Sequence, residues 1–188
     1  MKMKTKRFYI VALLMCAMSV FTSCSKGSDN SGGGSTPAAP DTTPVSIKFV
    51  YMAGVSPDVV QYMDAEVEYL DESGNVKTEK ITSAETWTKV ITFKLPAKMG
   101  ARLHLKKKSG VDYGKIEGLV KVGATLDRAY TLLNKSGGQL NTFNANIVIS
   151  TLDMKGESVE KYIEGKGTNH KSFYYEFDAS GKETKGSW

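Results

Sequence analysis

Apolar and polar residues alternate along most of the chain from Val45 onward, and this period of two constrains the fold more than any other feature. The apolar members of the runs are Val45, Ile47, Phe49, Tyr51; Ala65, Val67, Tyr69; Ile91, Phe93, Leu95; Leu103, Leu105; Ile116, Gly118, Val120, Val122; Tyr130, Leu132; Phe143, Ala145, Ile147, Ile149; and Phe173, Tyr175, Phe177. Successive side chains of a strand point to opposite faces, so each run predicts a strand with one buried face. A helical spacing is predicted only over Pro57–Met63 and Ser158–Ile163.

Three short segments share Asp in first place and Gly in fourth: Asp71–Gly74, Asp153–Gly156 and Asp178–Gly181. An Asp side chain accepts hydrogen bonds from the backbone of a turn, and Gly adopts the positive φ that closes it. Each segment follows the apolar end of a predicted strand. The pattern therefore predicts three hairpin turns and an antiparallel sheet.

Eight or more short strands with frequent turns predict an all-β domain over residues 45–188. Trp87 to Leu105 holds an apolar strand ending in Leu95-Pro96, a turn at Lys98-Met99-Gly100, and a strand over Ala101–Lys106. This stretch resembles the middle of immunoglobulin-like and transthyretin-like domains, which implies a single antiparallel β-sandwich. The alternative is a lipocalin-like β-barrel, which would enclose a ligand cavity where a sandwich would fill its interior.

The N-terminus has a different character. Lys2 to Arg7 is strongly cationic, and an apolar run then leads to Phe21-Thr22-Ser23-Cys24. A basic head, a short apolar core and small residues before a cleavage point are typical of a secretory signal. The last four residues resemble the lipobox of bacterial lipoproteins, although Phe21 replaces the usual Leu. The resemblance implies that residues 1–23 are a signal peptide and that Cys24 carries a lipid anchor.

Residues 24–44 are predicted to be a disordered tether behind the lipidated cysteine. Ser25 to Pro44 is rich in Gly, Ser, Thr and Pro and has no large apolar residue that could offset the entropy of ordering. Asp41-Thr42-Thr43 resembles the short O-glycosylation acceptor of Bacteroidota, whose lipoproteins commonly have such tethers, and this implies a glycan on Thr42. We expect an outer-membrane lipoprotein, and the sequence leaves open whether it faces the periplasm or the cell surface.

Charge and cysteine content exclude several classes of protein. The formal charge of +5 includes four basic residues of the N-terminal segment, Lys2, Lys4, Lys6 and Arg7, and no acidic ones. The remaining 21 basic and 20 acidic residues nearly balance, so nothing points to a nucleic-acid partner. The chain's two cysteines are Cys16, inside the signal, and Cys24. The β domain therefore has no disulfide, no thiol nucleophile and no cysteine metal site.

No catalytic motif is present in the sequence. Gly-x-Ser-x-Gly, a P-loop, a dinucleotide-binding glycine fingerprint, His-Glu-x-x-His and an EF-hand loop do not occur. Of the two histidines, His104 is predicted on a solvated strand face and His170 in an exposed loop. A zinc site that joined them would require a third ligand. We expect no metal and no cofactor.

One pair of carboxylates has a spacing known from glycosidases. Glu66 and Glu68 are predicted on one face of one strand, about 6.5–7 Å apart, which fits the spacing of an inverting glycosidase. However, Asp64 shares that face, and no apolar pocket is predicted beside it. We therefore expect a solvated acidic face, with the basic face of Arg102, His104 and Lys106 as its candidate neighbour on another strand.

Aromatic residues outside the alternation are the remaining candidates for ligand binding. Tyr113, in the loop Ser109–Gly114, is the ring expected to be most exposed, with Asp112 beside it. Trp87 either joins this site or packs into the core at the start of a strand, and Trp188 is terminal. Lys108 and Asn169 are possible polar neighbours.

These features predict a membrane-anchored, non-catalytic module of the cell envelope that binds a protein or glycan partner. The alternatives are a lipocalin-like carrier of a small ligand and an enzyme that acts on glycans.

Overall fold

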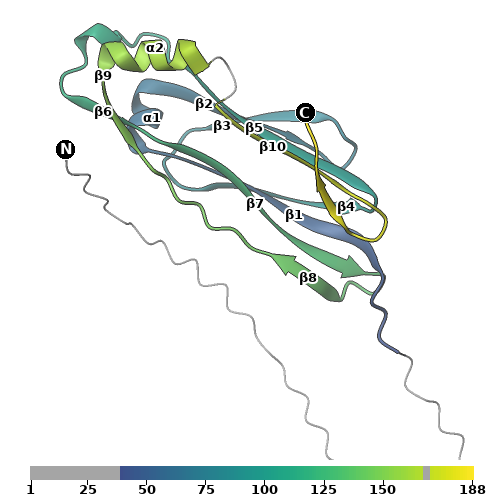
Figure 1. Ribbon diagram of the computed structural model, residues 1–188. Helices are drawn as coiled ribbons and strands as arrows, with labels where there is room; N and C mark the ends of the chain where they lie inside the picture. The colour runs from purple at the N-terminus through teal and green to yellow at the C-terminus, as the bar shows by residue number, and fades with distance from the viewer. Residues whose placement is uncertain (1–38, 167–169) are drawn as a thin grey trace, which may run out of the picture. The chain divides into compact units, whose positions relative to one another are not determined.

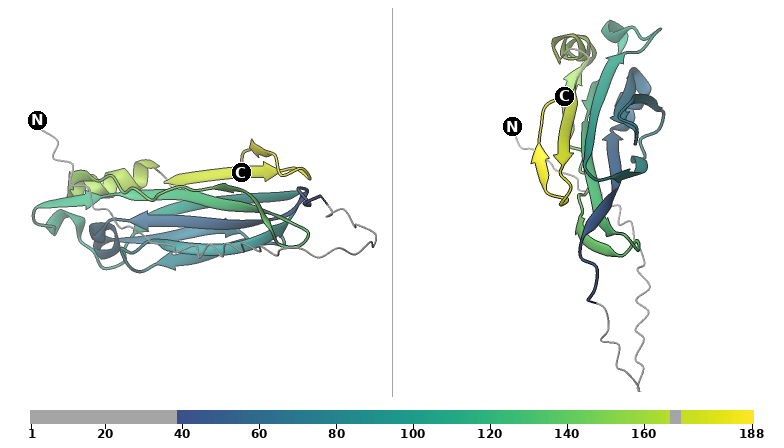
Figure 2. Two further views of the ribbon diagram at one scale, coloured as in Figure 1. Left: turned by 90° about the horizontal axis from the view of Figure 1, so that it is seen from below. Right: turned by 90° about the vertical axis from the view of Figure 1, so that its right-hand side faces the viewer.

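The computed structural model describes residues 39–166 and 170–188, in which two antiparallel sheets pack face to face (Figures 1 and 2). Sheet A has the order β4 (Trp87–Lys94), β1 (Pro44–Val55), β7 (Ala124–Asn134), β8 (Gln139–Phe143). Sheet B has the order β11 (Glu183–Lys185), β10 (Lys171–Phe177), β5 (Ala97–Lys107), β2 (Met63–Leu70), β3 (Val76–Ile81). The predicted all-β sandwich is confirmed. The barrel alternative is wrong, because the sheets do not close on each other.

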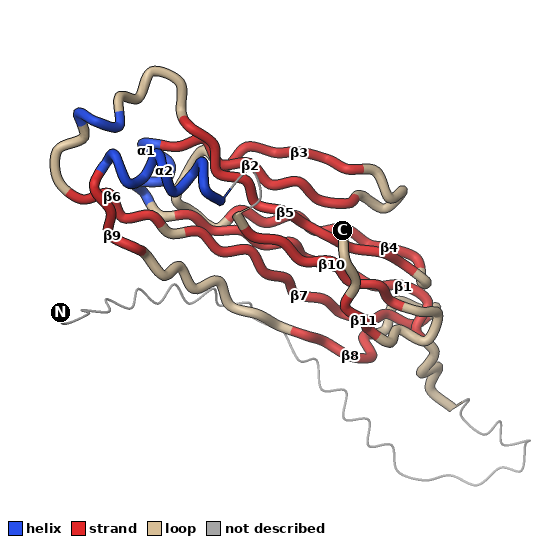
Figure 3. Tube along the Cα trace, turned by 45° about the horizontal axis from the view of Figure 1, so that its top comes forward, coloured by secondary structure: helices blue, strands red, loops and turns tan. Residues whose placement is uncertain are grey.

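Smaller elements lie at the end of the sandwich opposite the start of β1 (Figures 1 and 3). They are helix α1 (Pro57–Tyr62), the 3₁₀ turn η1 (Tyr113–Lys115), the two-stranded ribbon of β6 (Leu119–Val122) and β9 (Leu152–Lys155), and helix α2 (Gly156–Lys166). Both helices were predicted from the sequence, and α2 is longer than expected.

Strand β1 is the centre of the core. Ile47, Phe49 and Tyr51 are completely buried, as the alternation predicted, and the buried face continues through Ala53 and Val55. Val45, the first residue of the predicted run, is 42% exposed. The rings of Phe49 and Tyr51 are 4.8 Å apart, and the Tyr51 hydroxyl donates a 2.9 Å hydrogen bond to a carbonyl at the end of β2. Burial raises the pKa of Tyr51. Burial of each large side chain of this kind contributes about 1.5–3 kcal/mol to folding.

The hairpin turns follow the predicted chemistry at two of three positions. Asp71 and Asp178 each accept backbone hydrogen bonds from residues two and four positions on, and Gly74 and Gly181 have φ of +79° and +77°. The turn predicted at Asp153–Gly156 is wrong, because Asp153 lies in β9 and Gly156 begins α2. A Cβ at Gly156 would lie 2.0 Å from the Tyr113 carbonyl oxygen, so this glycine permits close packing and does not close a turn.

A turn that the Asp pattern missed connects β7 to β8. Asn134 takes the place of Asp and accepts backbone hydrogen bonds from Ser136 and Gly138, while Gly137 has a φ of +82°. Asn offers the same side-chain oxygen as Asp, so the signal was present in the sequence in another residue type.

Three strand predictions need correction. The strand predicted to start at Ala101 begins at Ala97, with its turn at Leu95-Pro96. The strand predicted from Ile116 begins only at Leu119, because Gly118, with a φ of +83°, interrupts it. The strand predicted over Phe143–Ile149 ends at Phe143, and residues 144–151 continue outside any sheet (Figure 3).

Candidate functional site

A groove of about 540 Å³ lies between the edge of sheet A at β4 and the hairpin of β2 and β3 in sheet B. Its lining residues are Tyr69, Asp71, Glu72, Lys77, Lys89, Val90, Ile91 and Thr92. Four of these residues are charged, Asp71, Glu72, Lys77 and Lys89, and Tyr69 and Thr92 each carry a hydroxyl group. Edge strand β4 forms one side of the groove. The groove combines hydrogen-bond donors and acceptors with the apolar surface of Val90 and Ile91.

Glu79 on β3 joins the two sheets next to this groove. Its carboxylate accepts hydrogen bonds from the Tyr69 hydroxyl (2.6 Å), from Lys89 Nζ (2.7 Å) and from Trp87 Nε1 (3.1 Å). Tyr69 belongs to sheet B, whereas Trp87 and Lys89 are on β4 of sheet A. Glu79 faces inward because it is paired with the buried Val67 of β2.

These contacts determine the protonation states beside the groove. Hydrogen bonds from Lys89 and Tyr69 hold the pKa of Glu79 below its ordinary value, and the same carboxylate raises the pKa of Lys89. Burial raises the pKa of Tyr69. Glu79 is thus an ionised carboxylate with three donors around it. It is suited to fixing Trp87 and Lys89 in place rather than to taking a proton from a substrate.

Asp71 and Lys77 form the mouth of the groove at the β2–β3 turn. Backbone hydrogen bonds from the turn lower the pKa of Asp71, and Lys77 Nζ lies 3.5 Å from its carboxylate. Lys77 is 55% exposed, so its ammonium group is available to a ligand in the groove. The site can hold a polar ligand by hydrogen bonds and charge.

The three predicted ligand-binding residues do not share one environment. Trp87 is half-buried at the first position of β4, with its ring centroid 5.7 Å from that of Tyr69. Tyr113 was expected to be exposed, and that expectation is wrong: it is only 5% exposed and donates a 2.7 Å hydrogen bond to the Tyr62 carbonyl at the end of α1. Asp112 is exposed, accepts from the Gly114 amide and pairs with Lys115.

Two other residues that the sequence suggested for the aromatic ligand site, Lys108 and Trp188, make contacts within the fold. Lys108 Nζ donates to the Val60 carbonyl (2.8 Å) in the last turn of α1, where a cation is favourable. The Trp188 ring packs over Gly100, where an added Cβ would lie 2.7 Å from it, and over the Arg102 guanidinium at 4.3 Å. No sequence pattern predicted this docking of Trp188 on sheet B. Asn169 lies outside the described residues.

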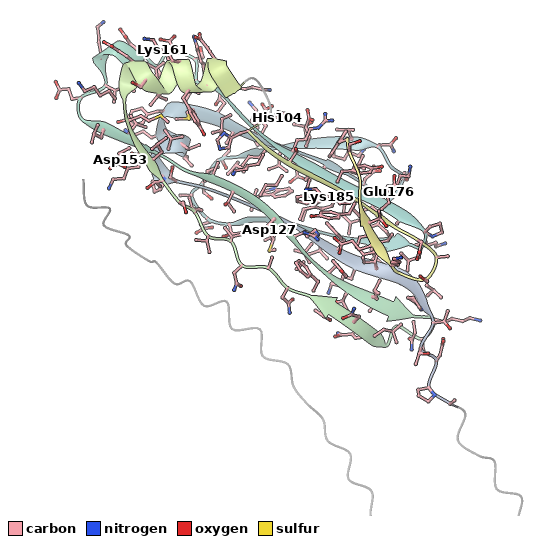
Figure 4. All side chains as sticks on the ribbon, viewed as in Figure 1. His104, Asp127, Asp153, Lys161, Glu176 and Lys185 are labelled. Carbon is pink, nitrogen blue, oxygen red and sulfur yellow. The ribbon has the colours of Figure 1, made fainter. Side chains whose placement is uncertain are left out.

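The histidine predictions were wrong about exposure. His104 is 7% exposed on β5 (Figure 4), and its Nε2 lies 3.0 Å from the Glu68 carboxylate. His170 is half-buried, with Nδ1 3.2 Å from the Tyr162 hydroxyl of α2. Alternation assigns a residue to a face but does not say which side chains cover that face.

The expected pairing of acidic and basic faces is confirmed. In the register of β2 and β5, Asp64 is opposite Lys106, Glu66 opposite His104, and Glu68 opposite Arg102. A hydrogen bond from Lys106 Nζ (2.5 Å) lowers the pKa of Glu66. The two glutamates are thus part of a ladder of opposite charges on the outer face of sheet B.

Of the residues named in the N-terminal predictions, Thr42 lies among those that the structure describes. The signal peptide, Cys24 and most of the tether lie outside the described residues. Thr42 is exposed in a segment without secondary structure, next to Asp41, whose carboxylate accepts a hydrogen bond from the Thr43 amide (3.0 Å). In residues 39–166 and 170–188, none of the helices has the length and hydrophobicity to cross a membrane.

Among the described side chains, no group of three or more His, Cys, Asp or Glu residues is arranged to hold a metal ion. Comparison of the chain with protein-family models, with curated proteins and with solved structures gave no match. The groove and the residues around it are therefore the features from which a function can be inferred.

Proposed function

We propose that this protein is a non-catalytic binding module, exported and held at the outer membrane by a lipid on Cys24, that binds a glycan or protein partner. The observation that carries the proposal is the open groove between β3 and β4, with Lys77, Asp71 and Thr92 on its walls. A filled sandwich interior argues against a carrier of the lipocalin type, since such a carrier needs an internal cavity.

The chemistry of the groove favours a glycan as the partner. Centres of protein interfaces are depleted in charged residues and enriched in aromatic ones, whereas this groove is lined by four charged side chains and by exposed parts of β4. A sugar offers several hydroxyl groups that both donate and accept hydrogen bonds. Side chains such as Lys77 and Asp71 match that pattern.

The test is a titration of the isotope-labelled unit Ala39–Trp188 with oligosaccharides released from the lipopolysaccharide and the peptidoglycan of the host bacterium, followed by backbone amide NMR. We expect shifts in residues 71–77 and 89–92. Lys77→Ala removes one charge-assisted hydrogen bond and should weaken binding roughly tenfold, or ~1.4 kcal/mol. Lys80→Ala is the matched control, since Lys80 is an exposed lysine of β3 paired with Glu66 on the other face.

Equal weakening by both substitutions, or shifts confined to other surfaces, would reject the groove as the site. A photo-crosslinker at position 77 in intact cells tests for a protein partner. A discrete protein adduct would show that the ligand of the groove is a protein and not a glycan.

The cellular part of the proposal is tested by protease shaving of intact cells with an antibody against Val45–Trp188. Cleavage while a periplasmic control survives indicates the cell surface, and protection until lysis indicates the periplasm. Radiolabelled palmitate should be incorporated into the wild-type chain and not into Cys24→Ser.

A further inference from the structure

Three edge strands of the sandwich carry a charged residue that points inward. Glu79 is on β3, Lys89 is on β4 opposite the buried Tyr51, and Glu183 is on β11 opposite the buried Phe177. An inward charge at an edge opposes pairing with a strand of another molecule, because that charge would lose its partner or its water. These three edges are therefore protected.

The fourth edge has no such protection. From Ser136 to Leu152 the chain has no charged residue and no proline, a stretch that includes β8 and the segment that leads to β9 (Figure 1). No backbone-to-backbone hydrogen bond joins residues 144–151 to any other part of the described chain. Val148 is 70% exposed and Leu152 is 57% exposed.

Side chains nevertheless hold this segment in an extended form. Its burial alternates: Ala145, Ile147 and Ile149 are half-buried, and the residues between them are exposed. The side chains of Ile147 and Ile149 fill the space that a side chain would take at Gly54, where an added Cβ would lie 2.9 Å from Ile147. The Thr125 hydroxyl donates a 2.9 Å hydrogen bond to the Val148 carbonyl. The segment is a strand in its side-chain packing, but its backbone groups lack the partners of a sheet.

The order of residues identifies what would pair with it. The residue types on the two sides of Val148 are nearly symmetric. Ile147 corresponds to Ile149, the polar Asn146 to the polar Ser150, and Ala145 to Thr151. An antiparallel copy centred on Val148 would place Ile147 opposite Ile149 and Asn146 opposite Ser150, with no like charges opposed. A two-fold interface requires this kind of self-complementarity.

We propose that residues 144–152 form an antiparallel pair with the same residues of a second copy of this chain. The pair would be about 30 Å long, would provide backbone partners for the segment, and would cover Val148 on both copies. It is independent of the groove and of the ligand proposed there.

The first test uses membranes of cells that express the full chain with Val148→Cys. Opposite residues of an antiparallel pair have Cα atoms about 4.5–5.5 Å apart, within the range of a disulfide. Mild oxidation should therefore give a disulfide-linked dimer. Val90→Cys is the matched control, because Val90 is another exposed valine (52%) but lies on β4, away from the segment. The unmodified chain accounts for Cys16 and Cys24.

Absence of the dimer with Val148→Cys, or an equal yield with Val90→Cys, overturns the proposal. A disulfide from position 148 to a different protein also overturns it and assigns the edge to another partner.

The second test measures the mass of the unit Ala39–Trp188, which has its own buried core, by sedimentation equilibrium over a range of concentrations. We expect a monomer–dimer equilibrium. Val148→Lys places two like charges opposite each other and should weaken dimerisation at least tenfold, whereas Val90→Lys should leave it unchanged. A wild-type unit that stays monomeric at every concentration, or two variants with equal effects, contradicts the pairing.

Discussion

Glu79 links the two sheets through hydrogen bonds to its carboxylate. It receives hydrogen bonds from Tyr69 of its own sheet and from Trp87 and Lys89 of the other. Sequence alternation placed Trp87 at the start of a strand, but it gave no reason to connect that residue to Glu79, eight positions earlier. The connection arises because β3 and β4 are edges of different sheets that meet at the groove.

Glu79→Gln should lower the free energy of unfolding by about 1 kcal/mol at pH 7. The hydrogen bonds from Tyr69 and Lys89 lose their charge assistance, and the amide nitrogen that replaces the second oxygen cannot accept from Trp87 Nε1. The pKa of Glu79 is lower in the folded protein than its ordinary value of 4.5. Its contribution is therefore present above that pH and disappears as the pH falls through the folded pKa. Urea unfolding from pH 7 to pH 3 should show the difference from wild type shrinking on the acid side.

Glu176→Gln is the control for this series. Glu176 (Figure 4) forms an exposed pair with Lys98 at 3.2 Å, so its substitution should change stability little. A loss for Glu79→Gln that is the same at every pH would contradict an electrostatic role.

At the scale of elements, the sequence predicts best those strands whose buried face is continuous. β1, β2 and the second half of β5 were predicted from alternation alone, and two hairpin turns from Asp and Gly. Residues 144–149 were predicted as part of a strand because their alternation is real: Ile147 and Ile149 are half-buried. What the pattern could not show is that they pack on Gly54 instead of extending the ladder of β7 and β8.

Gly54→Ala tests that packing. The new methyl group would lie 2.9 Å from Ile147 and 3.0 Å from Ile149, so the segment has to move, at a cost of about 1–3 kcal/mol. Gly165→Ala in α2 is the control, because no atom lies within 4 Å of its Cβ position and Ala favours a helix. We expect limited proteolysis within residues 144–151 to become faster only in Gly54→Ala. Equal proteolysis of both variants would show that Gly54 does not hold the segment.

At the scale of the whole molecule, each lateral opening between the sheets is closed by a cation of sheet A and a carboxylate of sheet B. Lys89 and Glu79 close one side, and Arg128 and Glu183 close the other. Lys89 and Arg128 are both register partners of Tyr51, one on each neighbour of β1. The sequence could not predict these pairs, nor the groove, because both depend on the strand order, which joins residues as far apart as positions 128 and 183.

The Arg128–Glu183 pair is the less exposed of the two, with side chains 13% and 22% exposed. The Arg128 guanidinium lies 3.7 Å from the ring centroid of Tyr175 and 4.7 Å from that of Phe143. The Tyr130 hydroxyl donates to Glu183 (2.8 Å), and burial together with this carboxylate raises the pKa of Tyr130 to about 12. Charge, stacking and hydrogen bonding thus converge on one side of the sandwich.

Arg128→Ala should therefore destabilise the protein by about 3 kcal/mol in urea unfolding, since it leaves the Glu183 carboxylate between the sheets without its counter-charge. Lys98→Ala, which breaks an ion pair whose lysine is 64% exposed, should cost no more than about 0.5 kcal/mol. Combining Arg128→Met with Glu183→Gln removes both charges and keeps the volume, so this double variant should recover part of the loss. A double variant less stable than Arg128→Ala would mean that stacking on Tyr175, and not the paired charge, closes this side of the sandwich.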